Sequence, residues 1–114
     1  MTKFIVLYRS TTSAREQMAS ATPEQMKAGM DAWMTWAGKA GDAIVDLGAP
    51  LAFTTHVDAG VGGAGDSGAA DVTGFSILQA DSAAAISGIL DGHPHLDMAG
   101  NSIDVLEQLA MPGM

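Results

Sequence analysis

TPEQMKAGMDAWMTWAGKAG, residues 22–41, is the stretch of sequence that decides the fold. Its first four residues form a capping box, in which Thr22 and Gln25 satisfy each other's backbone amides and a proline occupies the first helical position. Apolar side chains then recur at helical spacing: Met26, Met30, Trp33 and Ala37. These features predict a helix over 23–40 that Gly41 ends.

Short apolar segments rich in β-branched and aromatic residues lie before and after this helix, and they predict strands. The expected strands cover residues 3–9, 43–47, 72–80 and 102–110, and Asp81 or Ser82 caps a second helix at about 82–91. Connecting segments complete the expected order: a linker at 10–20, a bend at 48–50, an extended continuation at 51–57 and a Gly/Ala-rich loop at about 58–71.

The order strand, helix, strand, strand, helix, strand is that of the split βαβ, ferredoxin-like fold. We therefore predict one α+β domain over residues 1–114, with an antiparallel sheet and both helices on one face. The other face still carries apolar side chains, which a monomer rarely exposes. A second copy of the same sheet is the expected cover, so we predict a homodimer.

Composition excludes several classes of function. The net charge is −8 and the chain has only five Lys and Arg, so neither nucleic acid nor an anionic membrane surface is an expected partner. The absence of Cys excludes disulfides, thiolate metal sites and cysteine nucleophiles. The first apolar run, residues 4–8, is too short for a signal peptide or a membrane span, and the expected location is the cytoplasm.

The densest group of polar side chains is His93, His95 and Asp97. In an extended segment the two histidines point the same way, and Asp97 can join them. Three interpretations stay open for this group: a structural turn at the end of the second helix, a ligand or general-base site, and a divalent metal site. We expect no metal, because Pro94 and the neighbouring glycines favour a turn.

A second candidate pair is His56, on the extended segment 51–57, and Asp46, which interrupts an apolar strand. His56 is a candidate base if its face lines a cavity, and Asp46 is its candidate acidic partner. The alternatives are an ordinary hydrogen-bonded strand histidine and an edge-facing aspartate. Trp36, at the edge of the apolar stripe, and Tyr8 are candidate ligand contacts.

The glycine pattern G-x-G-x-x-G also occurs, at Gly60, Gly62 and Gly65. A dinucleotide site needs a helix to begin there, and only residues 66–71 precede the next strand. We interpret the pattern as part of a connecting loop. Methionines at helical spacing are typical of core filling, and we expect no cofactor.

Five pieces of the chain carry a resemblance to a known family: KFIVLYRS (3–10), the helix 22–41, IVDLGAPL (44–51), VTGFSILQADS (72–82) and GHPHLDMAGNSIDVLEQL (92–109). The chain resembles the YCII-related proteins, including the DGPF-domain branch, of the dimeric α/β-barrel superfamily. The resemblance implies a ferredoxin-like fold and a homodimer. The enzyme-like branch is associated with a His–Asp pair whose His lies near the first helix, and no His occurs in residues 23–40 here.

The function expected from these observations is binding of a small organic molecule in a cavity, with lyase or isomerase activity by proton transfer. His56 or His95 would act as the base, with Asp46 or Asp97 orienting it, and His93 would contact the ligand. Two alternatives stay open: a non-catalytic binding or accessory module, and a structural dimer whose cavity its own side chains fill. A histidine unpaired with any carboxylate would favour binding over catalysis.

Overall fold

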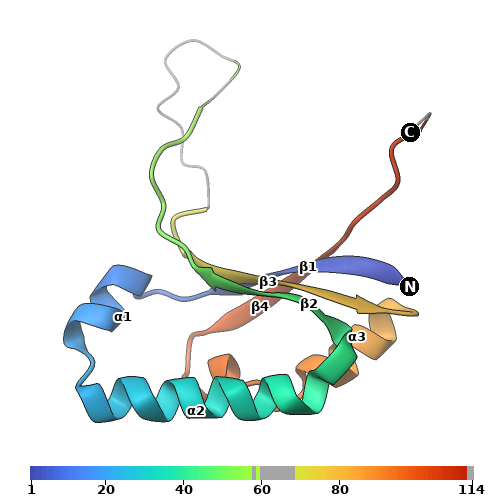
Figure 1. Ribbon diagram of the computed structural model, residues 1–114. Helices are drawn as coiled ribbons and strands as arrows, with labels where there is room; N and C mark the ends of the chain where they lie inside the picture. The colour runs from blue at the N-terminus through green and yellow to red at the C-terminus, as the bar shows by residue number, and fades with distance from the viewer. Residues whose placement is uncertain (58, 60–68, 113–114) are drawn as a thin grey trace.

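The computed structural model describes residues 1–57, 59 and 69–112 (Figure 1). The described elements, in chain order, are β1 (Thr2–Arg9), α1 (Ala14–Ser20), α2 (Pro23–Ala40), the 3-10 turn η1 (Gly41–Ala43), β2 (Ile44–Pro50), β3 (Val72–Ala80), α3 (Ala83–Leu90), the 3-10 turn η2 (Pro94–Asp97) and β4 (Ser102–Glu107).

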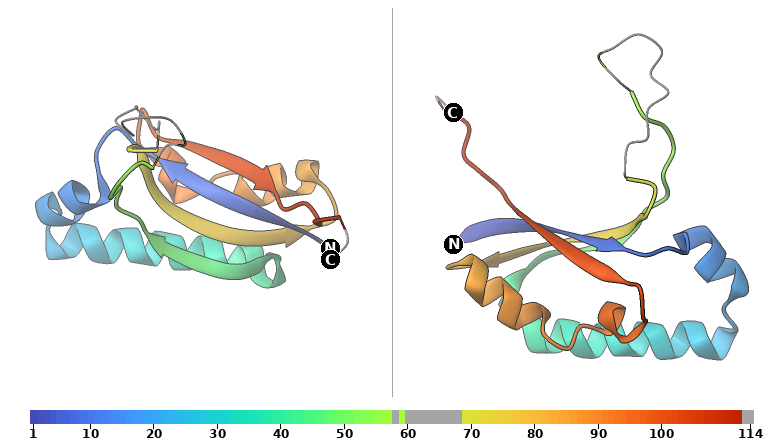
Figure 2. Two further views of the ribbon diagram at one scale, coloured as in Figure 1. Left: turned by 90° about the horizontal axis from the view of Figure 1, so that it is seen from above. Right: turned by 180° about the vertical axis from the view of Figure 1, so that it is seen from behind.

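The four strands form one antiparallel sheet in the order β2-β3-β1-β4. The three described helices, α1, α2 and α3, all lie on the same side of this sheet (Figures 1 and 2). In the view of Figure 1 this side is the lower one, and α2 runs along it beneath the sheet. The α+β, ferredoxin-like prediction is therefore confirmed. No helix in the described part of the chain is long and apolar enough to cross a membrane.

The core lies between the sheet and the helices. Alternate residues of β1 and β3 point into it, and the register places Phe4 opposite Leu78 and Val6 opposite Ser76. Helices α2 and α3 complete it with Trp36, Ile86 and Leu90. Every second residue of a strand, and every third or fourth residue of a helix, points to the same side. Each strand and helix therefore buries one face in this core.

Local sequence signals produce helix α2 as predicted. Thr22 Oγ1 accepts from the Gln25 amide at 3.1 Å, and the Gln25 side chain accepts from the Thr22 amide at 2.9 Å. Gly41, with φ of 55°, follows the last helical residue. Ser82 likewise caps α3 by accepting from the Ala85 amide.

Residues 10–20, predicted to be a linker, contain the additional helix α1. Ser13 caps it by accepting from the Glu16 amide at 3.2 Å, and the AREQMAS stretch that follows consists of good helix formers. The Ser-x-x-Glu spacing is that of a capping box, so the signal was present in the sequence.

The second strand also departs from the prediction. It runs through the expected bend and ends at Pro50, with irregular pairing to β3 between Ile44 and Ala49. The amide of Leu51 still donates to Thr73 O, but residues 52–57, expected to continue extended, pair with no strand in the described part of the chain. Strand β4 ends at Glu107 rather than at 110.

The face of the sheet away from the helices carries an apolar row. Ile5 pairs with Ile77 on one side and with Leu106 on the other, so the row crosses three strands. Ile5 is 37% exposed and Leu106 is 49% exposed. Figure 1 shows that none of the described helices covers this face.

Candidate functional site

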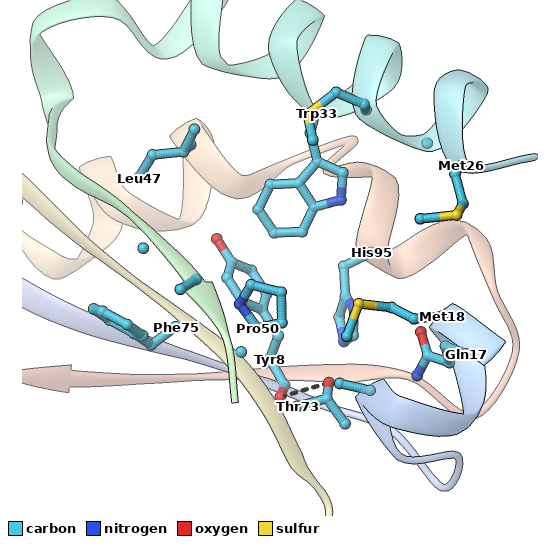
Figure 3. Close-up of a pocket in the computed structure, with 16 residues that line it drawn as sticks. Tyr8, Gln17, Met18, Met26, Trp33, Leu47, Pro50, Thr73, Phe75 and His95 are labelled. Carbon is cyan, nitrogen blue, oxygen red and sulfur yellow. Dashed lines mark hydrogen bonds between the residues drawn. The ribbon is translucent and has the colours of Figure 1, made fainter. Parts of the chain in front are cut away.

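A pocket of about 380 Å³ lies between α1, α2 and the end of the sheet where β1 and β2 finish (Figure 3). The size is within the range of small-molecule sites. Its polar lining side chains are Tyr8, Gln17, Thr73 and His95, together with the indole of Trp33.

The walls of the pocket are mostly apolar. Trp33 forms the wall on the α2 side, and its ring makes an edge contact with Tyr8 of β1 at 4.9 Å between centroids. Three methionines, Met18, Met26 and Met30, complete that side and are 49%, 52% and 62% exposed. Such exposed thioethers at a hollow are adaptable contacts for an apolar ring.

His95 brings the imidazole among the lining side chains, a ring with two nitrogens that can donate or accept a hydrogen bond. Its Nε2 lies 2.9 Å from the carbonyl oxygen of Arg9 and 3.0 Å from that of Ser102. Both partners are acceptors, so Nε2 carries the hydrogen and the neutral ring leaves Nδ1 as an acceptor. Among the described residues nothing hydrogen-bonds to Nδ1, so this atom is available to a ligand.

Tyr8 contributes its ring to the pocket but directs its hydroxyl into the core. Ser76 Oγ donates to Leu47 O at 2.6 Å, so the Tyr8 hydroxyl, 2.8 Å from Ser76 Oγ, donates to it. Burial raises the pKa of Tyr8 by more than the hydrogen bond to Ser76 lowers it. Tyr8 is therefore a neutral ring wall, as a ligand contact requires, and not a base.

His93, predicted to be a ligand contact, is completely buried and is not among the residues that line the pocket. Its ring lies within 4.5 Å of the Trp33 centroid and 4.3 Å of the Trp36 centroid, and Nδ1 accepts from the His95 amide at 3.0 Å. Desolvation, followed by the charge of His95, lowers the pKa of His93 to about 4. His93 caps η2 and fills the core as a neutral ring.

The two tryptophans exchange their expected roles. Trp36, predicted to be a ligand contact, is 5% exposed, and its indole nitrogen donates to Ile89 O at 2.9 Å. Trp33, which the helical pattern assigned to the core stripe, lines the pocket instead. The two residues are only three positions apart on α2, and the packing of α3 against the sheet decides which one is buried.

The predicted carboxylate partners do not meet His95. Asp46 Oδ1 accepts from the Gly48 amide at 2.8 Å, which stabilises the irregular part of β2. Asp97 belongs to η2, and no hydrogen bond or ion pair joins it to His95 within the described residues. Residues 94–97 form a 3-10 turn capped by His93, in line with the structural-turn interpretation, so their side chains do not align as they would in an extended segment.

His56 lies on the segment after β2 and is not among the residues that line this pocket. The glycine pattern at Gly60, Gly62 and Gly65 lies outside the described residues. Within the described ranges no group of three His, Asp or Glu side chains is arranged to hold a metal ion.

Gln17 is a pocket residue that sequence reasoning missed, because 10–20 was interpreted as a linker. Its Nε2 donates to Thr12 O at 2.6 Å and lies 3.3 Å from Ser10 Oγ. Figure 3 shows the amide oxygen on the opposite side, toward Met18 and Met26. Helix α1 thus forms one wall of the site, and the contacts with Thr12 and Ser10 hold the Gln17 side chain in one orientation.

Neither a family model nor a curated protein sequence matches this chain. Among solved structures, the chain is similar to 5-chloro-2-hydroxyhydroquinone dehydrochlorinase from Burkholderia phenoliruptrix AC1100, determined in complex with 2,5-dihydroxybenzoquinone. The identity is 15%, the TM-score is 0.47, and 91% of each chain is covered. A likeness this distant says nothing about the activity of the present chain.

Proposed function

We propose that this protein binds a small, mostly apolar organic molecule in the pocket between α1, α2 and the sheet. One observation carries the proposal: His95 presents an unpartnered ring nitrogen in an apolar pocket of about 380 Å³. A few convergent polar atoms in an otherwise apolar hollow are typical of small-molecule sites. Within the described part of the chain no carboxylate lines the pocket, which favours binding over catalysis.

The alternative of a structural dimer with a filled cavity is less well supported. It requires the tryptophan and methionine side chains to close the hollow. Trp36 instead lies in the core, and the three lining methionines are about half exposed, leaving the hollow open.

Proton transfer is a second candidate function, and the geometry of His95 favours it. Two backbone carbonyls hold Nε2–H, so the ring keeps one tautomer and one orientation. Backbone carbonyls orient histidines as carboxylates do, and the negative end of each carbonyl dipole faces the imidazolium that forms when Nδ1 takes a proton. A lyase or isomerase step at an acidic C–H bond of a bound molecule needs such a base.

Blocking the pocket from α2 is expected to abolish binding without unfolding the protein. Gly29 lines the pocket one turn before Trp33, and a Cβ placed on it meets no atom within 4 Å. In Gly29→Phe the new ring occupies the hollow. Ligand-observed NMR with a library of small aromatic compounds in D2O measures the result: broadening of ligand signals reports binding, and loss of a C–H signal reports proton exchange.

Gly38→Phe is the matched control for this experiment. Gly38 lies on the same helix, is exposed, and also has an open Cβ position, but it does not line the pocket. The control should bind as the wild type does, and His95→Gln should remove proton exchange. A library that gives equal broadening with wild type and Gly29→Phe would contradict the proposed site.

We further propose that the chain is a YCII-related protein that forms a single-domain homodimer through the open face of its sheet, with the cytoplasm as its expected location. The motif pieces quoted above support the family, and the row formed by Ile77, Ile5 and Leu106 supports the interface. Burying this row against a second copy would remove apolar surface from water, which stabilises the dimer by roughly 25 cal/mol for each Å² buried.

Light scattering after size-exclusion chromatography is expected to give twice 11.6 kDa at micromolar concentration. Ile5→Lys places a charge at the centre of the apolar row and is expected to give a monomer that remains folded, because Ile5 is already 37% exposed in one chain. Lys3→Ile, at an exposed position of the same strand and face, is the control and should stay dimeric. A wild-type monomer under these conditions would contradict the proposed interface.

A further inference from the structure

The polar groups that line the pocket have an unequal balance of donors and acceptors. Gln17 uses its amide nitrogen on Thr12 and Ser10 and turns its oxygen toward the pocket (Figure 3). Thr73 uses its hydroxyl hydrogen on Tyr8 O at 3.3 Å and keeps its oxygen lone pairs. Gln17 and Thr73 therefore each present an oxygen acceptor among the lining side chains.

His95 adds a third acceptor. Its hydrogen lies on Nε2, between two carbonyl oxygens, and the neutral ring presents Nδ1 as a lone pair. Among the lining side chains the donor is the indole N–H of Trp33, a neutral group, which Figure 3 shows on the edge of the ring nearer His95. Among the residues that the structure describes, no Lys or Arg lines the pocket, and the chain as a whole carries a net charge of −8.

We infer that the pocket selects an uncharged ring compound bearing a hydroxyl group and rejects its carboxylate counterpart. This inference rests on the proposed binding function and specifies its ligand class. A hydroxyl both donates and accepts, so it can donate to His95 Nδ1 or Gln17 Oε1 while accepting from Trp33. A carboxylate has no hydrogen to donate and would lie against these acceptors with no cation to neutralise it.

The test compares two probes with the same ring and chain length, 2-phenylethanol and phenylacetate, by NMR titration at about pH 8, where an ordinary imidazole is neutral. 2-Phenylethanol is expected to bind about tenfold more tightly or better, the factor that corresponds to one unsatisfied polar contact. Gln17→Lys replaces an acceptor with a cation and should reverse the preference. Gln108→Lys adds the same charge at an exposed position beyond β4 and should not.

The outcomes separate this inference from the proposed function. If phenylacetate binds as tightly as 2-phenylethanol, and Gly29→Phe abolishes the binding of both probes, the proposed binding site is supported. The inferred preference for a hydroxyl over a carboxylate is then wrong. If neither probe shows saturable binding that Gly29→Phe removes, the result counts against the proposed function and against this inference with it. A preference for 2-phenylethanol that Gln17→Lys leaves unchanged would overturn the role given to Gln17.

Discussion

Acidification from about pH 6.5 to about pH 4 is expected to lower the free energy of unfolding by about 3 kcal/mol through His93 alone. The ring is completely buried among Tyr8, Trp33 and Trp36, and its pKa falls from 6.5 to about 4 in the folded protein. The unfolded chain therefore binds a proton that the folded chain does not. The contribution of His93 is fully present above 6.5 and is lost as the pH falls toward 4.

His93→Asn separates this effect from general acid denaturation. Asparagine keeps an acceptor for the His95 amide, so η2 retains its cap, while the titrating group is removed. The variant is expected to lose about 2 kcal/mol at neutral pH from the cavity left by the smaller side chain, and to become much less dependent on pH.

Urea unfolding at several pH values between 7 and 4 measures the free energy of unfolding and the slope with which it changes with pH. His56→Asn is the control, because it makes the same substitution at a histidine outside the core cluster, and its slope is compared with those of the wild type and His93→Asn. Equal slopes in wild type and His93→Asn would show that His93 does not carry the pH dependence.

Gly48→Ala is expected to be the most damaging single substitution in the sheet, with a loss of about 4 kcal/mol or more. Gly48 has a φ of 88°, and a Cβ there would lie 1.6 Å from the carbonyl oxygen of Phe75 on the neighbouring strand. The backbone of β2 or β3 would have to move, which would also disturb the hydrogen bond from Ser76 to Leu47 O. Chemical unfolding of the variant measures the loss.

Gly38→Ala is the matched control for that substitution. Gly38 lies within α2 with nothing within 4 Å of its Cβ position, so alanine should stabilise the protein by up to about 1 kcal/mol through its higher helix propensity. A Gly48→Ala protein as stable as the wild type would mean that β2 does not approach β3 as closely as described.

The sequence by itself determined the features that depend on neighbouring residues. The helix 23–40 begins and ends as predicted, because the Thr22–Gln25 capping box and Gly41 act within a single turn of backbone. The ferredoxin-like class follows from the order of apolar strand segments and helices along the chain, and the structure supplies the order of the strands in the sheet. Helix α1 was also locally encoded, through Ser13 and Glu16, although the segment was interpreted as a linker.

Only the tertiary structure decided which polar and aromatic side chains reach the pocket. Trp33 and Trp36 carry the same local signals, and the contact of Trp36 with Ile89 O on α3 leaves Trp33 to line the hollow. His93 and His95 are separated by one residue, yet one is buried and the other faces the pocket, because Pro94 begins a 3-10 turn rather than a strand. Contacts between segments distant in the chain, such as His95 with Arg9 O, have no signature in local sequence, and these contacts position the candidate site.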